Sequence, residues 1–141
     1  MKNKFIARFC LCVGFLLSAQ AYAGVAVIVS ANNGNTTIDA DMVSRIFLGK
    51  TSSFPDGSPA IPVDQSEGAA SRESFNETVL GKSSSQLKAY WSRLIFTGKG
   101  TPPKESGSDA DVKALVANNP NLIGYIDSSA VDGSVKVLYS F

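Results

Sequence analysis

The sequence predicts an α/β fold in which a mixed sheet is flanked by helices. Short apolar segments with the composition of buried strands alternate with segments whose apolar residues recur at helical spacing. Turns rich in Gly, Pro and Asn separate these segments, and no internal repeat is present. Interleaved strands and helices are typical of a layered α/β domain. Residues 24–141 are enough for one such domain and too few for two.

The first two strands and the first helix follow from local patterns. Residues 25–29 are a continuous run of Val, Ile and Ala, as expected of a strand covered on both faces. Asp39 can cap a helix that Gly49 should end. A turn-rich loop then leads to a strand over residues 60–63. Phe54, in that loop, either tucks under the fold or projects as an anchor for a partner, and the sequence leaves both open.

Two helices are predicted in the middle of the chain. One runs from about Ala69 to Leu80. The next begins at a capping box of the form S-x-x-Q at Ser83. Its apolar stripe recurs at i, i+3, i+4, i+7 and i+8 and is expected to face the core. The stripe consists of Leu87, Tyr90, Trp91, Leu94 and Ile95.

A short helix and two strands complete the prediction. Ser108 caps the helix, and Val112, Leu115 and Val116 are expected to point inward. The sequence Asn-Pro at residues 119–120 ends it. Strands are predicted over residues 122–126 and 135–139, and they either pair as a hairpin-like unit or cross over.

Composition argues against catalysis. Both cysteines lie within residues 1–23 and the chain has no histidine, which excludes Ser-His-Asp and Cys-His catalysis and the usual ligands of zinc. The carboxylate pairs Asp39 with Asp41 and Asp109 with Asp111 stand at predicted helix starts, where capping and the helix dipole explain them. No nucleotide-binding or calcium-binding motif is present. We therefore expect no enzyme activity, no cofactor and no metal site.

Residues 1–23 have the pattern of a secretory signal. A basic start precedes the apolar run from Phe9 to Leu17, and Ala21-Tyr22-Ala23 fits cleavage after Ala23. A stable membrane anchor would need about 20 apolar residues, and this run is shorter. Without these residues the chain has 10 basic and 12 acidic side chains. No basic patch stands out, so binding to nucleic acid or to an anionic membrane has no support in the sequence.

The most informative segment joins the second strand to the next helix. A Gly-containing turn that opens a helix offers unpaired backbone N–H groups to an anion. Ser30 and Asn32, in the loop after the first strand, are expected to lie close to this turn and to share its ligand. The candidate ligand-binding residues of the turn are Gln65, Ser66, Gly68, Ala69, Ala70, Ser71 and Arg72.

Several motifs resemble the second lobe of the phosphate-binding proteins of bacterial ABC importers, which have the type 2 periplasmic binding protein fold. The resemblance implies one lobe of that fold, a periplasmic location, a phosphate ligand and no catalysis. The motifs are Arg45-Ile46-Phe47-Leu48-Gly49-Lys50, residues 61–75, Tyr90-Trp91, residues 96–103 and Ile123-Gly124-Tyr125-Ile126-Asp127.

The binding turn departs from the family pattern R-x-x-G-S-G-T. Gln65 stands in place of the Arg, Ala69 in place of the Ser, Ala70 in place of the second Gly and Ser71 in place of the Thr. Losing two hydrogen bonds to a charged group, at roughly 1.5–3 kcal/mol each, weakens binding by ~10² to 10⁴-fold. Glu67 adds a negative charge beside the turn. Arg72 and Lys50 are the residues that can compensate.

The resemblance covers one lobe, whereas importer binding proteins close two lobes on the ligand. The leading interpretation is therefore an exported, non-enzymatic binding or interaction module with a degraded anion site, which contacts an envelope protein. The alternative is a component of phosphate uptake that binds phosphate or another oxyanion weakly and works as a homodimer.

Overall fold

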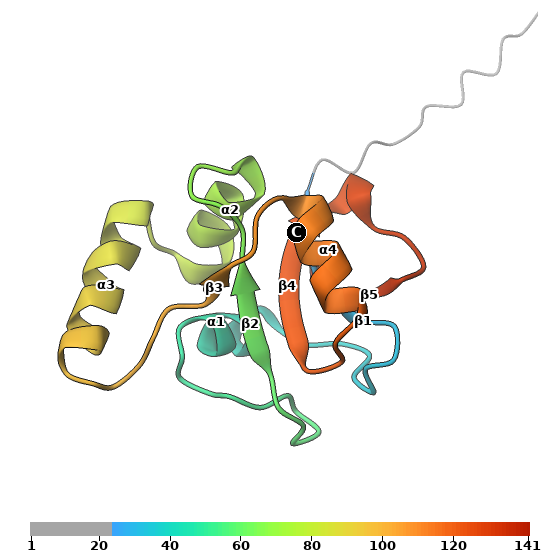
Figure 1. Ribbon diagram of the computed structural model, residues 1–141, viewed down its shortest axis with the longest axis horizontal. Coiled ribbons are helices and arrows are strands. Elements are labelled where there is room, and N and C mark those ends of the chain that lie inside the picture. Colours follow the sequence, from blue (N-terminus) through green and yellow to red (C-terminus); the bar gives the residue numbers. More distant parts are fainter. Residues whose placement is uncertain (1–23) are drawn as a thin grey trace, which may run out of the picture.

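The computed structural model describes residues 24–141, so the predicted signal over residues 1–23 lies outside the described residues. Five strands form one mixed sheet in the order β3-β2-β4-β1-β5 (Figure 1). β1 is antiparallel to both of its neighbours, and β2 is parallel to β3 and β4. The strands are β1 (Val25–Ser30), β2 (Ile61–Asp64), β3 (Lys104–Glu105), β4 (Leu122–Asp127) and β5 (Val135–Ser140).

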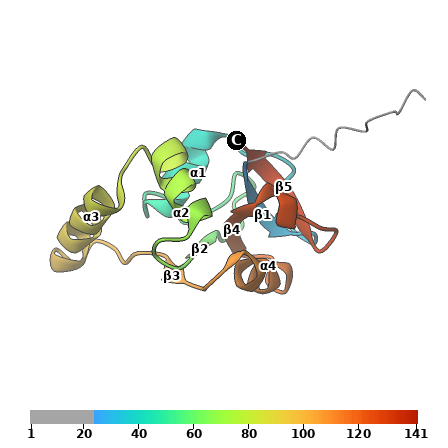
Figure 2. The ribbon, with the colours of Figure 1, turned by 90° about the horizontal axis from the view of Figure 1, so that it is seen from above.

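Helices cover both faces of this sheet (Figure 2). On one face, α1 and α2 pack over Val27 and Tyr125, and on the other face α4 packs over Ile28 and Ile126. The continuous apolar run of β1 is thus buried on both sides, as its composition predicts. The helical elements are α1 (Ala40–Phe47), α2 (Ala70–Phe75), the π-helical turn η1 (Asn76–Leu80), α3 (Ser84–Phe96), α4 (Asp109–Ala117) and the 3₁₀ turn η2 (Ser128–Ala130). The predicted fold class, a mixed sheet flanked by helices, is confirmed.

The predicted caps are also confirmed. Asp39 accepts a hydrogen bond from the backbone N–H of Met42, and Ser83 and Ser108 each form a capping box. Gly81 ends the η1 turn in the left-handed conformation, with φ of 63°. Phe54, whose role the sequence leaves open, is buried in the core cluster that includes α1.

Two details of the prediction are wrong. The helix predicted from residue 69 to residue 80 begins at Ala70 and changes to a π-helical turn at Asn76. β3 is not predicted, because it is two residues long and belongs to a Pro-containing loop. The sequence leaves open whether the last two strands pair or cross over, and the structure has the crossover, because β1 lies between β4 and β5.

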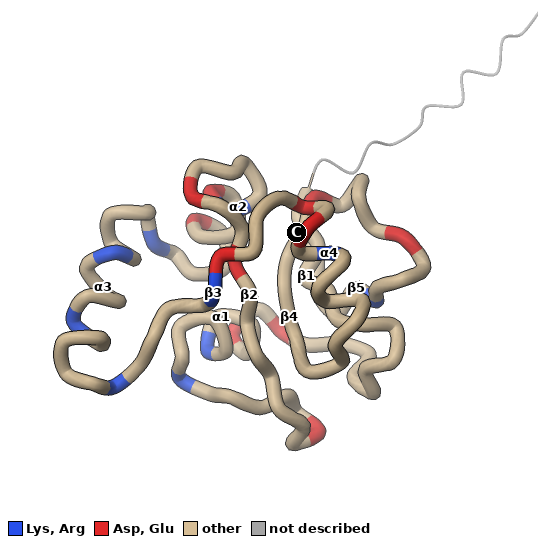
Figure 3. The backbone as a smooth tube through the Cα atoms, in the orientation of Figure 1, with Lys and Arg blue, Asp and Glu red and all other residues tan. Residues whose placement is uncertain are grey.

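The largest difference concerns α3, which lies at one end of the molecule, away from the sheet (Figures 1 and 2). Of its predicted core stripe only Leu87 is buried, and Ile95 is 54% exposed. The charged residues of α3 and its flanking segments are all basic, whereas acidic residues are spread over the rest of the molecule (Figure 3). No helix within residues 24–141 is long and apolar enough to cross a membrane.

Candidate functional site

The predicted binding turn, residues 65–71, joins β2 to α2 at one edge of the sheet. β2 and β4 are parallel, so both end at this edge, and the register of β1 with β4 places Val25 beside Asp127 there. The segment after β3 also reaches this edge, because the backbone N–H of Ser66 donates to the carbonyl of Gly107 at 2.9 Å. The turn is therefore surrounded by the ends of β2 and β4 and the start of α4.

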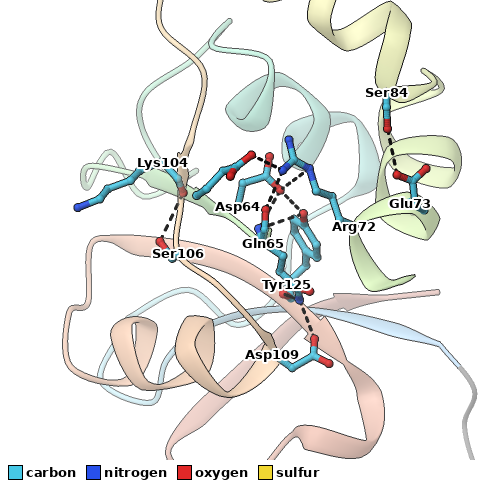
Figure 4. A network of polar contacts seen from close by, with 10 residues as sticks. Asp64, Gln65, Arg72, Glu73, Ser84, Lys104, Ser106, Asp109 and Tyr125 are labelled. Atoms are coloured by element: carbon cyan, nitrogen blue, oxygen red, sulfur yellow. Dashed lines mark hydrogen bonds and ion pairs between the residues drawn. The ribbon is translucent and has the colours of Figure 1, made fainter. Parts of the chain in front are cut away.

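Gln65 does not face solvent from this turn. Its side chain is only 2% exposed, and its amide nitrogen Nε2 donates to Oδ1 of Asp109 at 2.6 Å and to the carbonyl of Tyr125 at 2.8 Å (Figure 4). Both hydrogens of the amide are thus used inside the protein. The residue that stands in place of the family's Arg is a structural link between β2, β4 and α4.

Asp109, the first residue of α4, is the common hydrogen-bond acceptor of three donors at this edge. Its Oδ1 accepts hydrogen bonds from Nε2 of Gln65 at 2.6 Å, Oγ of Ser71 at 3.2 Å and the backbone N–H of Asp127 at 3.0 Å. A single carboxylate oxygen therefore accepts hydrogen bonds from three donors. Two of these donors belong to the predicted anion-binding turn and are no longer free to bind a ligand. Sequence reasoning assigns Asp109 only to the helix dipole and misses this role.

Arg72 is held by the protein's own acceptors. Its Nη1 donates to the carbonyl of Gln65 at 2.8 Å and to Oε1 of Glu105 at 2.7 Å, and its Nε lies 3.6 Å from Oδ1 of Asp64. The guanidinium sits between two carboxylates, so its charge is already balanced. Arg72, which the sequence offers as a cation that can compensate for the lost donors, is thus already engaged inside the protein.

Asp64 and Tyr125 form the buried part of the same network (Figure 4). The hydroxyl of Tyr125 donates to Oδ1 of Asp64 and accepts the backbone N–H of Gln65 at 3.4 Å. Burial raises the pKa of Asp64 above its ordinary value, although the Tyr125 hydroxyl and the Arg72 charge act in the opposite direction. Burial and the neighbouring Asp64 raise the pKa of the Tyr125 hydroxyl.

The raised pKa of Asp64 predicts how stability depends on pH. A carboxyl group with a raised pKa in the folded state binds its proton more tightly there. Its contribution to stability is fully present below the ordinary pKa of 3.8 and is lost as the pH rises through the folded value. We therefore expect Asp64→Asn to become more stable relative to the unmodified chain between pH 3 and pH 7, as measured by urea unfolding.

Asp111 provides the matched control for this measurement. Hydrogen bonds from the backbone and side chain of Ser108 lower the pKa of Asp111, so its contribution is present above 3.8 and is lost as the pH falls. The Asp111→Asn variant should accordingly lose relative stability as the pH rises from 3 to 7. The same trend in both variants would contradict the assignment of the Asp64 shift.

The remaining predicted residues divide between the two edges of the sheet. Ser66, Gly68 and Ala70 are exposed in the turn and Ala69 is half-buried. Ser71 is buried against Asp109. Gly68 in this turn has a left-handed φ of 86° and no atom within 4 Å of the place where a Cβ would stand. The backbone there is accessible.

The expectation that Ser30 and Asn32 lie close to this turn is wrong. β1 runs antiparallel to β4, and β2 runs parallel to it, so β1 ends at the sheet edge where β2 begins. At that edge Oγ of Ser30 donates to the carbonyl of Ala117 at 3.2 Å, and Asn32 donates its backbone N–H to the same Oγ at 3.2 Å. The two residues support the end of α4 and share no surface with the turn.

A cavity of about 510 Å³ lies next to the turn, between it and α3. Asp64, Glu67 and Glu105 line it together with Arg72 and Lys88, and Trp91 contributes to its apolar wall. Acidic side chains outnumber basic ones in this lining, which disfavours an anionic ligand. The sequence pattern contains no signal for this cavity, because its walls come from segments far apart in the chain.

No protein-family model matches the chain. Among solved structures it is similar to a protein of Clostridium perfringens assigned as a phosphate ABC transporter substrate-binding protein and solved with bound phosphate, with 27% identity and a TM-score of 0.67 over 84% of this chain and 45% of that one. An ABC-type phosphate transport receptor from Vibrio cholerae matches with 21% identity and a TM-score of 0.64, over 82% and 45% of the two chains. PstS from Borrelia burgdorferi matches with 14% identity and a TM-score of 0.62, over 84% and 47%.

The chain thus spans less than half the length of each of these three proteins. The two matches below 25% identity establish the fold alone. Together with the sheet order, these likenesses confirm the resemblance that the motifs indicate. The described residues have the fold of one lobe of the phosphate ABC transporter substrate-binding proteins, of the type 2 periplasmic binding protein class.

Proposed function

We propose that the chain is an exported, non-enzymatic binding or interaction module whose anion site no longer binds phosphate tightly and which contacts an envelope protein. One observation carries the proposal: the carboxylate of Asp109 occupies the donors of Gln65 and Ser71 in the turn where the resemblance places phosphate. Location in the periplasm is part of the proposal and rests on the signal pattern before Gly24 and on the similarity to transporter binding proteins.

Electrostatics supports the loss of tight binding. An anion in the turn would meet the charge of Asp109, and two unit charges 4 Å apart repel by about 4 kcal/mol at an effective dielectric constant of about 20. Arg72 offers little compensation, because Asp64 and Glu105 already balance its charge. The turn therefore offers an unfavourable electrostatic environment for an anion.

The alternative is that the chain binds phosphate or another oxyanion weakly and acts as a dimer in phosphate uptake. The likeness to the phosphate-bound structure from Clostridium perfringens favours it, since that protein is 27% identical over most of this chain. The open backbone at Gly68 favours it as well. In this case a second copy would supply the wall that the other lobe supplies in a two-lobe protein.

Calorimetry with phosphate and a measurement of the oligomeric state together separate the two functions. We expect no binding tighter than high micromolar, because the side-chain donors at Gln65 and Ser71 are occupied and Ala69 has none. A submicromolar dissociation constant would contradict the leading proposal. Analytical ultracentrifugation with and without phosphate completes the test, since the alternative requires a dimer that phosphate stabilises.

A further inference from the structure

Basic and acidic side chains lie in different parts of the molecule. The net charge of the chain is close to zero and therefore does not reveal this separation. Residues 78–104 contain five basic side chains and no acidic one, and the rest of the described chain contains five basic side chains and all 12 acidic ones. Four of these basic residues, Lys82, Lys88, Arg93 and Lys99, lie in α3 or in the segments beside it, at one end of the molecule (Figure 3). The fifth, Lys104, lies in β3 at the edge of the sheet.

We call α3 and its flanking residues, 82–103, the α3 arm. The arm projects from the body of the protein and contacts it at a few points (Figure 2). The hydroxyl of Tyr90 donates to the carbonyl of Leu48 at 2.7 Å, and Nζ of Lys88 lies 2.6 Å from Oε1 of Glu67. Cavities of about 510 and 380 Å³ lie between the arm and the body. The arm is thus a convex protrusion that its own chain covers only in part.

The end of the arm combines exposed apolar and basic side chains. Phe96 is 93% exposed and Ile95 54% exposed, the two highest values among the large apolar residues of the described chain. Arg93 and Lys99 flank them, are exposed, and form no ion pair within residues 24–141. Such an aromatic side chain among cations is favourable at the boundary between lipid headgroups and acyl chains.

We propose that the tip of the α3 arm, formed by Arg93, Ile95, Phe96 and Lys99, docks reversibly on an anionic lipid surface. Peripheral binding of this kind needs only a few inserted apolar groups and nearby cations. A stable protein interface buries about 800 Å² on each partner around a packed apolar centre, whereas the tip presents only two exposed large apolar side chains, Ile95 and Phe96. The acidic residues of the body lie away from the tip, so the lipid meets the basic end of the molecule (Figure 3). This inference does not depend on the proposed function.

Vesicle flotation tests the inference with the chain beginning at Gly24, because residues 24–141 contain every element of the described fold. We expect binding to vesicles of equal parts phosphatidylglycerol and phosphatidylcholine and none to phosphatidylcholine alone. Trp91, the single tryptophan, lies in the arm, so its fluorescence should shift on binding. Raising the salt concentration to about 0.5 M should release the protein, because exposed charges are then screened within a few ångströms.

Two variants and a control locate the contact. Phe96→Ser should lower the lipid partition coefficient by about 10- to 100-fold. The double variant Arg93→Gln with Lys99→Gln should lower it by roughly 30-fold, at about fivefold for each cation. Leu115→Ser removes an apolar side chain that is 45% exposed on α4 and should leave binding unchanged. Circular dichroism establishes that each variant is folded.

Three results would overturn the inference. One is the absence of binding to anionic vesicles at low salt, and another is equal binding by the Phe96→Ser variant. The third is a dimer in solution that Phe96→Ser dissociates, since Phe96 would then be covered by a second copy of the chain rather than by lipid.

Discussion

Replacing Asp109 with alanine should destabilise the protein by about 2–4 kcal/mol and should at the same time create a site for a small anion. The variant loses one carboxylate oxygen that accepts from Gln65, Ser71 and the backbone of Asp127. A buried donor left without a partner costs about 1–3 kcal/mol. The same substitution should create an anion site, because the three donors then point toward a space that a small anion can enter.

Phosphate or formate should restore part of the lost stability of this variant. A ligand present at about 100 times its dissociation constant stabilises the folded state by about 2.7 kcal/mol. For a site with a dissociation constant of about 1 mM, this requires about 100 mM phosphate and raises the melting temperature on the order of 10 °C. Thermal unfolding in phosphate and in chloride at equal ionic strength measures the effect. The unmodified chain should show no such difference.

Asp111→Ala is the matched control for Asp109→Ala. Both variants remove one carboxylate from the first turn of α4, and they change the net charge equally. Asp111 accepts from Ser108 in the capping box and contacts none of the three donors, so its loss should destabilise the protein less than the loss of Asp109, and anions should not rescue it. Equal rescue of both variants would show that phosphate acts on the helix terminus in general and that Asp109 holds no specific anion site.

Local signals in the sequence predict most of the elements. The caps at Asp39, Ser83 and Ser108 depend on residues three positions apart, so they are visible without any knowledge of the fold. The buried run of β1 is equally local. The π-helical turn at Asn76 and the short strand β3 have no comparable pattern, because packing of the neighbouring elements decides them.

The polar network of the site could not be predicted in the same way. Asp109 bonds to residues 44, 38 and 18 positions away in the chain, and its place at a helix start already has a sufficient local explanation. The mistaken pairing of Ser30 with the turn has a similar origin. Strand direction decides which loops meet at an edge, and the antiparallel direction of β1 is a property of the whole sheet.

The apolar stripe of α3 illustrates a further limit. Periodicity predicts which face of a helix is apolar, and it does not say what covers that face. Leu87 is buried as expected, but Ile95 at the far end of the same stripe is exposed, as is Leu115 of α4. The exposed end of the α3 stripe is one of the observations on which the proposed lipid contact rests. The residue at which the core prediction is wrong is therefore also a residue of the proposed docking surface.

Phe75→Ala should lower the free energy of unfolding by about 3–5 kcal/mol, whereas Phe96→Ala should change it by less than about 0.5 kcal/mol. Phe75 is 1% exposed and stacks on the ring of Tyr125 with centroids 4.1 Å apart, while Phe47 meets it at 4.7 Å with its edge. Its loss leaves a cavity and removes the support of the residue that bonds both Asp64 and Gln65. Phe96 is 93% exposed and has no such neighbours to lose.

Urea unfolding of the two variants measures this contrast between identical substitutions. A small domain has a free energy of unfolding of only about 5–15 kcal/mol, so Phe75→Ala should shift the midpoint of urea unfolding far toward low urea concentration. The midpoint of Phe75→Leu should lie between those of Phe75→Ala and the unmodified chain. A stability loss in Phe96→Ala comparable with that of Phe75→Ala would mean that the α3 arm is packed as part of the core. A neutral result for Phe96 instead leaves its exposed ring without a role in folding, as the proposed contact with lipid requires.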